Sequence, residues 1–284
     1  MAKVVIFGTG AAGRAIYRVI KDKDDIVAFI DNSPSKINTF YKGIKIIAPA
    51  ELKKLNFDAV LIGGVWADEM SAQLLNLGID KEKIKLIDDK DISYSTDNRA
   101  KTTNYYVKSL VGILDELGYD YFIDGSGLLS ILRKRELSVV SDVDIMLFEN
   151  KSLSNLANIL PQVFPELNIE IRYCQKDYAA RKKGDIFNII ISDNSEEKMV
   201  LDINAYDKYK NFYTLPYNEK YFYIPKEFLD ELISLDYKDF KLKAPKRYDE
   251  YLSLVYGKNY LEIPKQFLAN DYGNLVDFQT LKKL

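Results

Sequence analysis

The chain has 284 residues, of which 47% are hydrophobic and 13% are aromatic, enough for two domains of ordinary size with buried cores. Lysine and arginine (40) nearly balance aspartate and glutamate (42), and the net charge is −2. This balance excludes a global electrostatic attraction to nucleic acid or to an anionic membrane. We therefore expect a globular protein with no nucleic-acid partner.

Two residue types that carry much enzyme chemistry are absent or rare. The sequence has no histidine, which removes Ser-His-Asp and Cys-His nucleophilic machinery and ordinary zinc catalysis. The single cysteine, Cys174, excludes an internal disulfide and is expected to be a buried apolar residue. Carboxylates, lysine, tyrosine and hard metal ions remain to carry a reaction. Because no apolar stretch approaches the ~20 residues that span a bilayer, we expect a cytoplasmic protein, with peripheral membrane association left open.

The first ninety residues begin with a strand, a glycine-rich turn and a helix. The three glycines of the turn are Gly8, Gly10 and Gly13. They allow a tight turn, close approach of a diphosphate to the backbone, and close packing of the helix. A second strand ends at Asp31, eighteen residues beyond the last glycine, where an acid can bind a ribose hydroxyl. The pattern predicts a nucleotide-binding βαβ unit.

The strand and helix patterns continue to alternate through residue 90. Strands are expected at 44–47, 59–64 and 83–87, with helices between them. This alternation indicates a parallel, doubly wound α/β sheet. The stretch "GTGAAG…FIDNSPSK…GIKIIAPAEL" resembles the small Rossmann-like domains attached to bacterial sugar-modifying enzymes. The resemblance implies a bound nucleotide or nucleotide sugar; the alternative is a fold whose crevice is empty or makes only protein contacts.

A polar, aperiodic stretch separates this domain from the rest. We place the first domain at 1–90, a linker at 91–104 and a second domain at 105–284. The second domain is expected to begin with a helix at 105–117 and to be a mixed α+β fold. Its strands are expected at 121–124, 141–147, 169–174, 186–192 and 198–206. A polar turn typical of a hairpin separates the last two.

Two aspartates, Asp142 and Asp144, stand together at the start of an apolar strand. Positions i and i+2 of a strand share a face, so the two carboxylates project to the same side at a spacing of ~5–7 Å. Such a pair resists burial unless a positive charge compensates, and Mg²⁺ is suited to this because it binds carboxylate oxygens and substrate phosphates. Asp202, in a later apolar strand, would join them if the two strands are neighbours. The alternative for Asp202 is an acid that caps the end of a hairpin strand.

A glycine and a serine precede the acidic pair. Gly125 and Ser126 are expected between a strand and a helix, where their amides and the serine hydroxyl can bind a phosphate beside the metal. Glycine-serine, an acid-x-acid pair about sixteen residues later and a single acid on a later strand form the pattern of the nucleotidyltransferase fold typified by DNA polymerase beta. The second domain is therefore predicted to have this mixed-sheet fold.

The segment "DGSGLLSILRKRELSVVSDVDIML" resembles the LicD and fukutin-related family, in which a Gly-Thr-Leu-Leu-Gly-x-x-Arg segment precedes a Trp-Asp-Asp-Asp-x-Asp motif. The residues that keep their places are Leu128, Leu129, Arg133, Asp142 and Asp144. The stretch "PKRYDEYLSLVYGKNYLEIP" (245–264) is similar to the closing signature of that family. The chain departs from the pattern at 139–141, where the tryptophan and the first acid are replaced, and at Ser130, which replaces a glycine.

The resemblance implies transfer of a phosphorylated alcohol, such as phosphocholine or a polyol phosphate, from its CDP ester to a sugar hydroxyl of a surface glycan or a nucleotide sugar. Asp142 and Asp144 would hold Mg²⁺ or Mn²⁺, and Asp202 would be the third ligand or the base. Arg133 and Arg247 are the expected phosphate contacts. The alternative for Arg133 is a cation that suits the dipole at the C-terminal end of a helix, and the alternative for Arg247 is a solvated helix start.

Two functions of other kinds stay open. The same metal site could make an activated ester from a nucleoside triphosphate and release pyrophosphate. Alternatively, the chain could be a non-catalytic nucleotide-sugar-binding protein. Four tyrosines of the closing signature are expected mainly in the core, although a ring could stack on a base or a choline group. They are Tyr248, Tyr251, Tyr256 and Tyr260. The oligomeric state is open.

Overall fold

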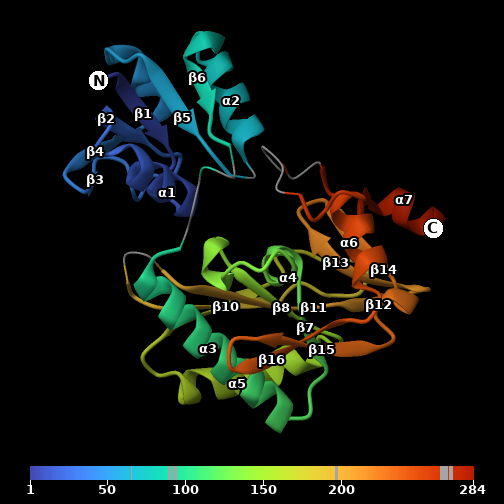
Figure 1. Ribbon diagram of the computed structural model, residues 1–284. Coiled ribbons are helices and arrows are strands. Elements are labelled where there is room, and N and C mark those ends of the chain that lie inside the picture. Colours follow the sequence, from blue (N-terminus) through green and yellow to red (C-terminus); the bar gives the residue numbers. More distant parts are fainter. Residues whose placement is uncertain (65, 89–90, 92–94, 196–197, 263–267, 269–270) are drawn as a thin grey trace. The chain divides into compact units, whose positions relative to one another are not determined.

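The computed structural model describes residues 1–284 except 65, 89–90, 92–94, 196–197, 263–267 and 269–270 (Figure 1). The chain divides into two compact units. Unit 1 comprises Met1–Tyr94 and Glu262–Asp271, and unit 2 comprises Ser95–Leu261 and Tyr272–Leu284. Each unit contains a sheet with parallel strand pairs and packed helices, so the protein is of mixed α/β type.

Unit 1 is built on a six-stranded sheet in the order β3-β4-β2-β1-β5-β6. Its strands are β1 (Lys3–Phe7), β2 (Asp25–Ile30), β3 (Phe40–Tyr41), β4 (Ile44–Ile47), β5 (Ala59–Ile62) and β6 (Ile84–Leu86). All pairs are parallel except the edge pair of β3 and β4. Between the strands lie α1 (Ala11–Ile20), α2 (Ala67–Asn76) and the 3-10 helices η1 (Pro49–Lys54) and η2 (Lys81–Lys83). The predicted parallel, alternating arrangement is confirmed.

The apolar run of β1 is explained by burial on both faces of this sheet. Val5 and Phe7 belong to one apolar cluster, whereas Val4 and Ile6 belong to another. Successive side chains of a strand point to opposite faces, so a strand covered on both sides must be apolar at every position. Helices that follow the strands cover both faces, as the alternating pattern predicts.

Unit 2 contains a five-stranded mixed sheet in the order β7-β8-β11-β10-β9. Its strands are β7 (Tyr121–Ile123), β8 (Val143–Leu147), β9 (Asn168–Tyr173), β10 (Ile186–Ser192) and β11 (Val200–Ala205). β8 and β11 are parallel, and the other pairs are antiparallel. Apolar residues of these strands form one core with α3 (Asp97–Glu116) and α5 (Lys151–Val163), which lie on the same side of the sheet in Figure 1. The other face of β8 and β11 carries the aspartates.

The rest of unit 2 contains strands that the sequence patterns do not predict. A four-stranded antiparallel sheet has the order β12-β13-β14-β17, and a separate hairpin joins β15 and β16. These strands are β12 (Asp207–Tyr209), β13 (Phe212–Tyr217), β14 (Lys220–Pro225), β15 (Leu232–Tyr237), β16 (Phe240–Pro245) and β17 (Leu275–Asp277). The remaining helices are α4 (Gly125–Leu132), η4 (Leu137–Val139), η5 (Lys226–Phe228), α6 (Tyr248–Tyr256) and α7 (Phe278–Lys283).

Two boundaries differ from those expected from the sequence. Residues 97–104, expected to be linker, form the first turns of α3 because the Thr96 hydroxyl accepts from the amide of Arg99 at 3.3 Å, and Arg99 and Thr103 are buried. Residues 92–94 of the expected linker lie outside the described residues. Glu262–Asp271, expected in the second domain, belongs to unit 1, where Leu268 packs against its apolar cluster. Residues 263–264 of the closing signature lie outside the described residues.

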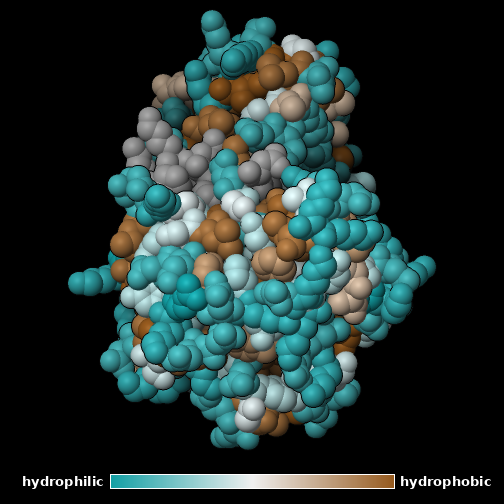
Figure 2. Space-filling view, turned by 90° about the vertical axis from the view of Figure 1, so that its right-hand side faces the viewer, coloured by the Kyte–Doolittle hydropathy of each residue, from teal (hydrophilic) through white to brown (hydrophobic). Residues whose placement is uncertain are grey.

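No helix in the described part of the chain is long and apolar enough to cross a bilayer. In Figure 2, hydrophilic side chains cover much of the visible face and apolar ones form separate patches. Cys174 is buried, as expected, and its burial raises the pKa of the thiol. That thiol is therefore a packing residue and a poor nucleophile.

Candidate functional site

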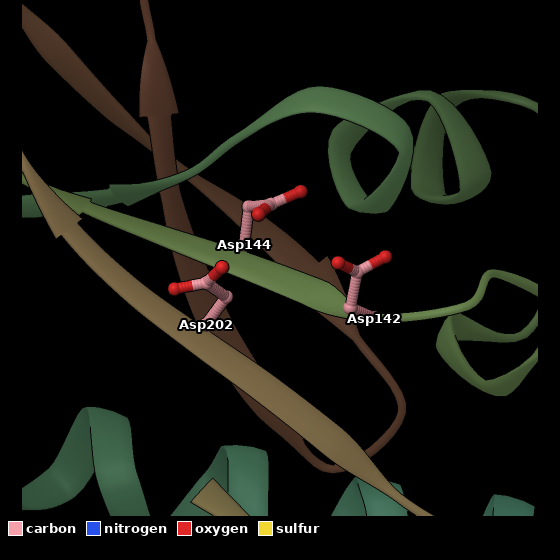
Figure 3. A group of neighbouring side chains, drawn as sticks. All are labelled: Asp142, Asp144 and Asp202. Carbon is pink, nitrogen blue, oxygen red and sulfur yellow. The ribbon is translucent and has the colours of Figure 1, made fainter. Parts of the chain in front are cut away.

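Three aspartates meet on one face of the unit 2 sheet (Figure 3). Asp144 on β8 lies directly opposite Asp202 on β11, and Asp142 comes just before β8. One carboxylate oxygen from each of the three lies within 4.8 Å of the others. Figure 3 shows all three side chains on the same side of the two strands. The structure thus brings together the acids that the strand pattern singled out, whereas their roles stay a prediction.

Burial and mutual repulsion oppose the ionisation of these carboxylates. Burial raises the pKa of Asp144 well above its ordinary value, and the charges of Asp142, Asp202 and Asp124 raise it further. Burial likewise raises the pKa of Asp202 to about 7, although a hydrogen bond from Asn188 at 2.8 Å acts in the opposite direction. An assembly of carboxylates that resist ionisation together is what a bound cation would stabilise.

The donor set fits a hard divalent cation. All three groups are carboxylates, the ligands preferred by Mg²⁺ and Mn²⁺, and the spacing of their oxygens allows one ion to contact all three. The buried Asn188 beside Asp202 has a side-chain oxygen without a hydrogen-bond partner among the described residues. A buried amide oxygen of this kind needs a donor, and a water molecule of a hydrated ion would supply one.

A fourth acid, Asp124, was not identified from the sequence as part of this group. It is 7% exposed and caps α4, because its carboxylate accepts from the amide of Gly125 at 2.6 Å. It also accepts from the hydroxyl of Tyr251 and from that of Tyr206 at 3.4 Å. Burial raises the pKa of Asp124. The strand-acid-glycine-serine order is itself a helix-cap signal and could have indicated this role.

The four tyrosines of the closing signature divide as follows. Tyr251 and Tyr260 are buried, as expected for core residues, and their hydroxyls donate to Asp124 and Asp249. Tyr248 and Tyr256 are partly buried against the unit 2 core. The closing signature therefore contributes directly to the support of the acid cluster through Tyr251.

Gly125 and Ser126 lie inside the first turn of α4 instead of in a turn before the helix. The amide of Gly125 is bonded to Asp124, so it is engaged within the chain instead of being directed at a phosphate. Gly125 has φ +55, and a Cβ there would lie 3.2 Å from an oxygen of Asp144 and 3.5 Å from the hydroxyl of Tyr256. The positive φ and the close approach of Asp144 both favour glycine at this position. Ser126, in the same turn, is partly buried.

The two arginines predicted to bind phosphate have structural partners. Arg133 ends α4, and its guanidinium donates to the carbonyl of Leu261 at 3.1 Å and to that of Tyr260. Arg247 precedes α6 and donates to Glu250 at 3.0 Å. These bonds favour the structural alternative for both side chains. Their phosphate contacts stay a prediction.

The glycine-rich turn of unit 1 has the backbone that the motif predicts. Gly8 has φ +88, and its amide donates to the carbonyl of Ile30 at 2.7 Å. A Cβ on Gly13 would lie 1.9 Å from the carbonyl oxygen of Gly8, so this glycine permits close packing of α1. Gly10 precedes α1, and a Cβ there would meet nothing within 4 Å. Of the three, Gly10 is the position where the missing side chain leaves space beside the helix start.

Asp31 is bound within the chain instead of pointing away from it as a ribose acceptor would. Its carboxylate accepts from the amide and hydroxyl of Thr9 at 2.9 and 2.6 Å, from the amide of Ser33 at 2.9 Å and from Lys36 at 3.1 Å. Burial opposes its ionisation, but these bonds outweigh burial and lower the pKa of Asp31 to about 2. The acid therefore ties the glycine-rich turn to the loop after β2, and its predicted contact with ribose stays a prediction.

Asp31→Ala is expected to lower the free energy of unfolding of unit 1 at pH 7 by about 1–3 kcal/mol, because the buried donors of Thr9 and the partly buried amide of Ser33 lose their acceptor. Since the folded pKa of about 2 lies below the ordinary 3.8, the wild-type stabilisation is present above pH 4 and is lost as pH falls toward 2. Denaturant titrations at several pH values, followed by fluorescence of Trp66, the single tryptophan, measure it.

The control is Asp22→Ala, which removes an exposed acid of unit 1. It should leave the midpoint of Trp66 unfolding unchanged at every pH. Equal unfolding midpoints for the two variants at pH 7 would show that Asp31 does not stabilise the turn.

Residues 1–85 match the protein family described as C2185-like, N-terminal. No curated protein matches the chain. Among solved structures, the chain is similar to UDP-D-quinovosamine 4-dehydrogenase from Vibrio fischeri, with 26% identity over 30% of this chain and 75% of that chain and a TM-score of 0.25.

Two further similarities cover more of the chain at lower identity. The lincosamide antibiotic adenylyltransferase LnuA, bound to lincomycin, is 13% identical over 55% of this chain and 84% of that one, with a TM-score of 0.35. The putative oxidoreductase yvaA from Bacillus subtilis is 9% identical over 86% and 84%, with a TM-score of 0.25. All three TM-scores are low.

Proposed function

We propose that unit 2 is a divalent-metal-dependent transferase of nucleotidyltransferase type, which moves a phosphorylated alcohol from a CDP ester to a sugar hydroxyl. The observation that carries the proposal is the meeting of Asp142, Asp144 and Asp202 around one point from two parallel strands. The resemblance of the surrounding segment to the LicD and fukutin-related family supports the choice of donor and acceptor. Unit 1, with its glycine-rich turn, is proposed to be a Rossmann-like domain for a nucleotide or nucleotide sugar.

The structure supports a metal at this point through charge and through hydrogen bonding. When bound, Mg²⁺ would neutralise the diphosphate of the donor and favour departure of CMP. Asp142, Asp144 and Asp202 would hold it. Asn188 donates a hydrogen bond to Asp202 and so fixes its orientation. Asp124 caps the start of α4 at Gly125, and Asp144 lies against this glycine. These contacts hold Asp202 and the backbone beside Asp144 in place.

The proposed reaction requires one proton acceptor. The hydroxyl oxygen of the acceptor sugar bonds to the phosphorus that carries the alcohol, the bond from that phosphorus to CMP breaks, and CMP leaves with the electron pair. Asp202 is the candidate acceptor for the hydroxyl proton, as the alternative to its role as third metal ligand, because its carboxylate lies beside those of Asp142 and Asp144. No histidine is needed for this sequence of events.

A ³¹P NMR assay tests the proposal. Wild type is mixed with Mg²⁺, a series of CDP-alcohols and sugar or nucleotide-sugar acceptors, and in a second series with CTP and alcohol phosphates. Release of CMP with formation of a sugar phosphodiester supports the transferase. Release of pyrophosphate from CTP would instead show that the same site forms an activated ester, and the transferase proposal would give way to that function.

Asp142→Ala should lose the activity, and Asp236→Ala, which changes an exposed acid of unit 2, should keep it. If wild type releases neither product from any donor and Asp142→Ala binds CDP and CTP as wild type does, the enzymatic proposal is wrong. A non-catalytic nucleotide-binding protein would then remain.

A further inference from the structure

A row of four polar side chains crosses four neighbouring strands of the unit 2 sheet. Arg172 on β9 pairs with Asn188 on β10, and Asn188 donates to Asp202 on β11 at 2.8 Å. Asp202 in turn lies opposite Asp144 on β8. The row, defined by Arg172, Asn188, Asp202 and Asp144, therefore connects an arginine on the edge strand with the acid cluster.

The alternation of each strand places the whole row on one face. In β9, Glu170 and Arg172 are exposed, whereas Ile169 packs against the apolar core. In β10, Ile189 belongs to that same core and Asn188 points to the other side. Since alternate residues of a strand share a face, Arg172 projects from the face that carries the aspartates.

The present partner of Arg172 is weakly held. Its Nε lies 2.7 Å from Glu170 Oε1, two residues back along β9, and the two side chains are 51% and 60% exposed. Exposed ion pairs of this kind contribute little to stability, so Arg172 can exchange Glu170 for a more strongly bound anion. Arg172 also projects from the same face as Asp202, and only β10 lies between their strands. Arg172 is therefore a positive group within range of whatever binds at the aspartates.

We propose that Arg172 binds the second phosphate group of the diphosphate donor, the group that carries the alcohol and that CMP lacks. The inference rests on the proposed function, because it assumes a diphosphate ligand at the metal. β9 lies two strand spacings from β11, about 10 Å, which a diphosphate and an extended arginine side chain bridge together. The planar guanidinium matches two phosphate oxygens at once. Arg133 and Arg247, the arginines expected from the sequence, donate elsewhere.

Calorimetric titration of wild type and variants with CDP and with CMP, in the presence of Mn²⁺, tests the proposal, and Mn²⁺ binding alone is followed by EPR. Arg172→Ala should weaken binding of CDP by 10- to 100-fold and that of CMP by less than threefold. Its affinity for Mn²⁺ should equal that of wild type. Glu170→Gln, which removes the competing carboxylate, should bind CDP as tightly as wild type or more tightly. Lys241→Ala, which removes an exposed cation also paired with an acid, should bind CDP unchanged.

Several outcomes separate the two proposals. Equal CDP affinity for Arg172→Ala and wild type overturns the role of Arg172 and leaves the metal centre intact. Binding of Mn²⁺ but not CDP by wild type also overturns it. Failure of wild type to bind Mn²⁺ at all removes the proposed function itself. Equal losses for CDP and CMP would show a general effect of charge and would likewise contradict a contact with the second phosphate.

Discussion

Asp144→Asn is expected to abolish metal-dependent transfer and, at the same time, to make the metal-free protein more stable. Asp144 is a partly buried carboxylate whose pKa is raised by burial and by three neighbouring acids. Asparagine has the same shape without the charge, so it removes the repulsion and the desolvation cost but is a much weaker metal ligand. We expect activity to fall by roughly 10³-fold, as when other charge-stabilising groups are removed, and the free energy of unfolding in EDTA to rise by about 1–3 kcal/mol.

Urea titrations of wild type and Asp144→Asn, each in EDTA and in Mg²⁺, measure the stability part. Mg²⁺ should raise the unfolding midpoint of wild type through binding to the folded state, and it should have no such effect on the variant. Asp236→Asn, which neutralises an exposed acid on β15, should respond to Mg²⁺ as wild type does. A variant that is less stable than wild type in EDTA and equally stabilised by Mg²⁺ would contradict a metal centre at Asp144.

The acid cluster could be predicted because it follows from local rules. Asp142 and Asp144 share a face by strand geometry, and an acid in an apolar strand such as Asp202 indicates a partner. The missing step was the pairing of β8 with β11, which the structure shows to be direct and parallel. The parallel sheet of unit 1 could likewise be predicted from the sequence. Apolar runs in strands that are buried on both faces, and a glycine-rich turn, are local signals.

Other features depended on contacts between residues far apart in the chain. Arg172 lies in an unremarkable strand, and only the register across β9, β10 and β11 brings it to the face of the aspartates. Arg99 lies in a polar stretch whose composition predicts a linker. Its role could not be seen there, because its buried partners are carbonyls some 40 to 100 residues away. Backbone acceptors leave no trace in side-chain composition, so a buried arginine that binds them is indistinguishable in sequence from an exposed one.

Substitution of Arg99 is also expected to lower both stability and metal affinity strongly, because this side chain holds the starts of both strands that carry the aspartates. It is 5% exposed, and its guanidinium donates to the carbonyls of Lys198 at 2.9 Å, Ser138 at 2.9 Å and Ser141 at 2.7 Å. Ser141 directly precedes Asp142, and Lys198 lies two residues before β11. One side chain therefore connects the backbone on both sides of the cluster.

Arg99→Lys keeps the charge but cannot reach three carbonyls in different directions. We expect a loss of about 2–4 kcal/mol in the free energy of unfolding, because buried carbonyls lose charged donors, and a 10- to 100-fold weaker affinity for Mn²⁺, because the aspartates lose their alignment. Urea titration in EDTA and EPR titration with Mn²⁺ measure the two effects separately.

Arg181→Lys is the matched control. Arg181 is also fully buried in unit 2, and it donates to Asp207 at 2.7 Å and to the carbonyls of Phe187, at 2.8 Å, and Ala205. None of these groups lies at the start of β8 or β11, so the variant should lose a similar amount of stability and keep the wild-type affinity for Mn²⁺. If both variants lose Mn²⁺ affinity in proportion to their lost stability, Arg99 acts only through general destabilisation. If only Arg99→Lys loses it, the guanidinium positions the acid cluster through the backbone of the two strands.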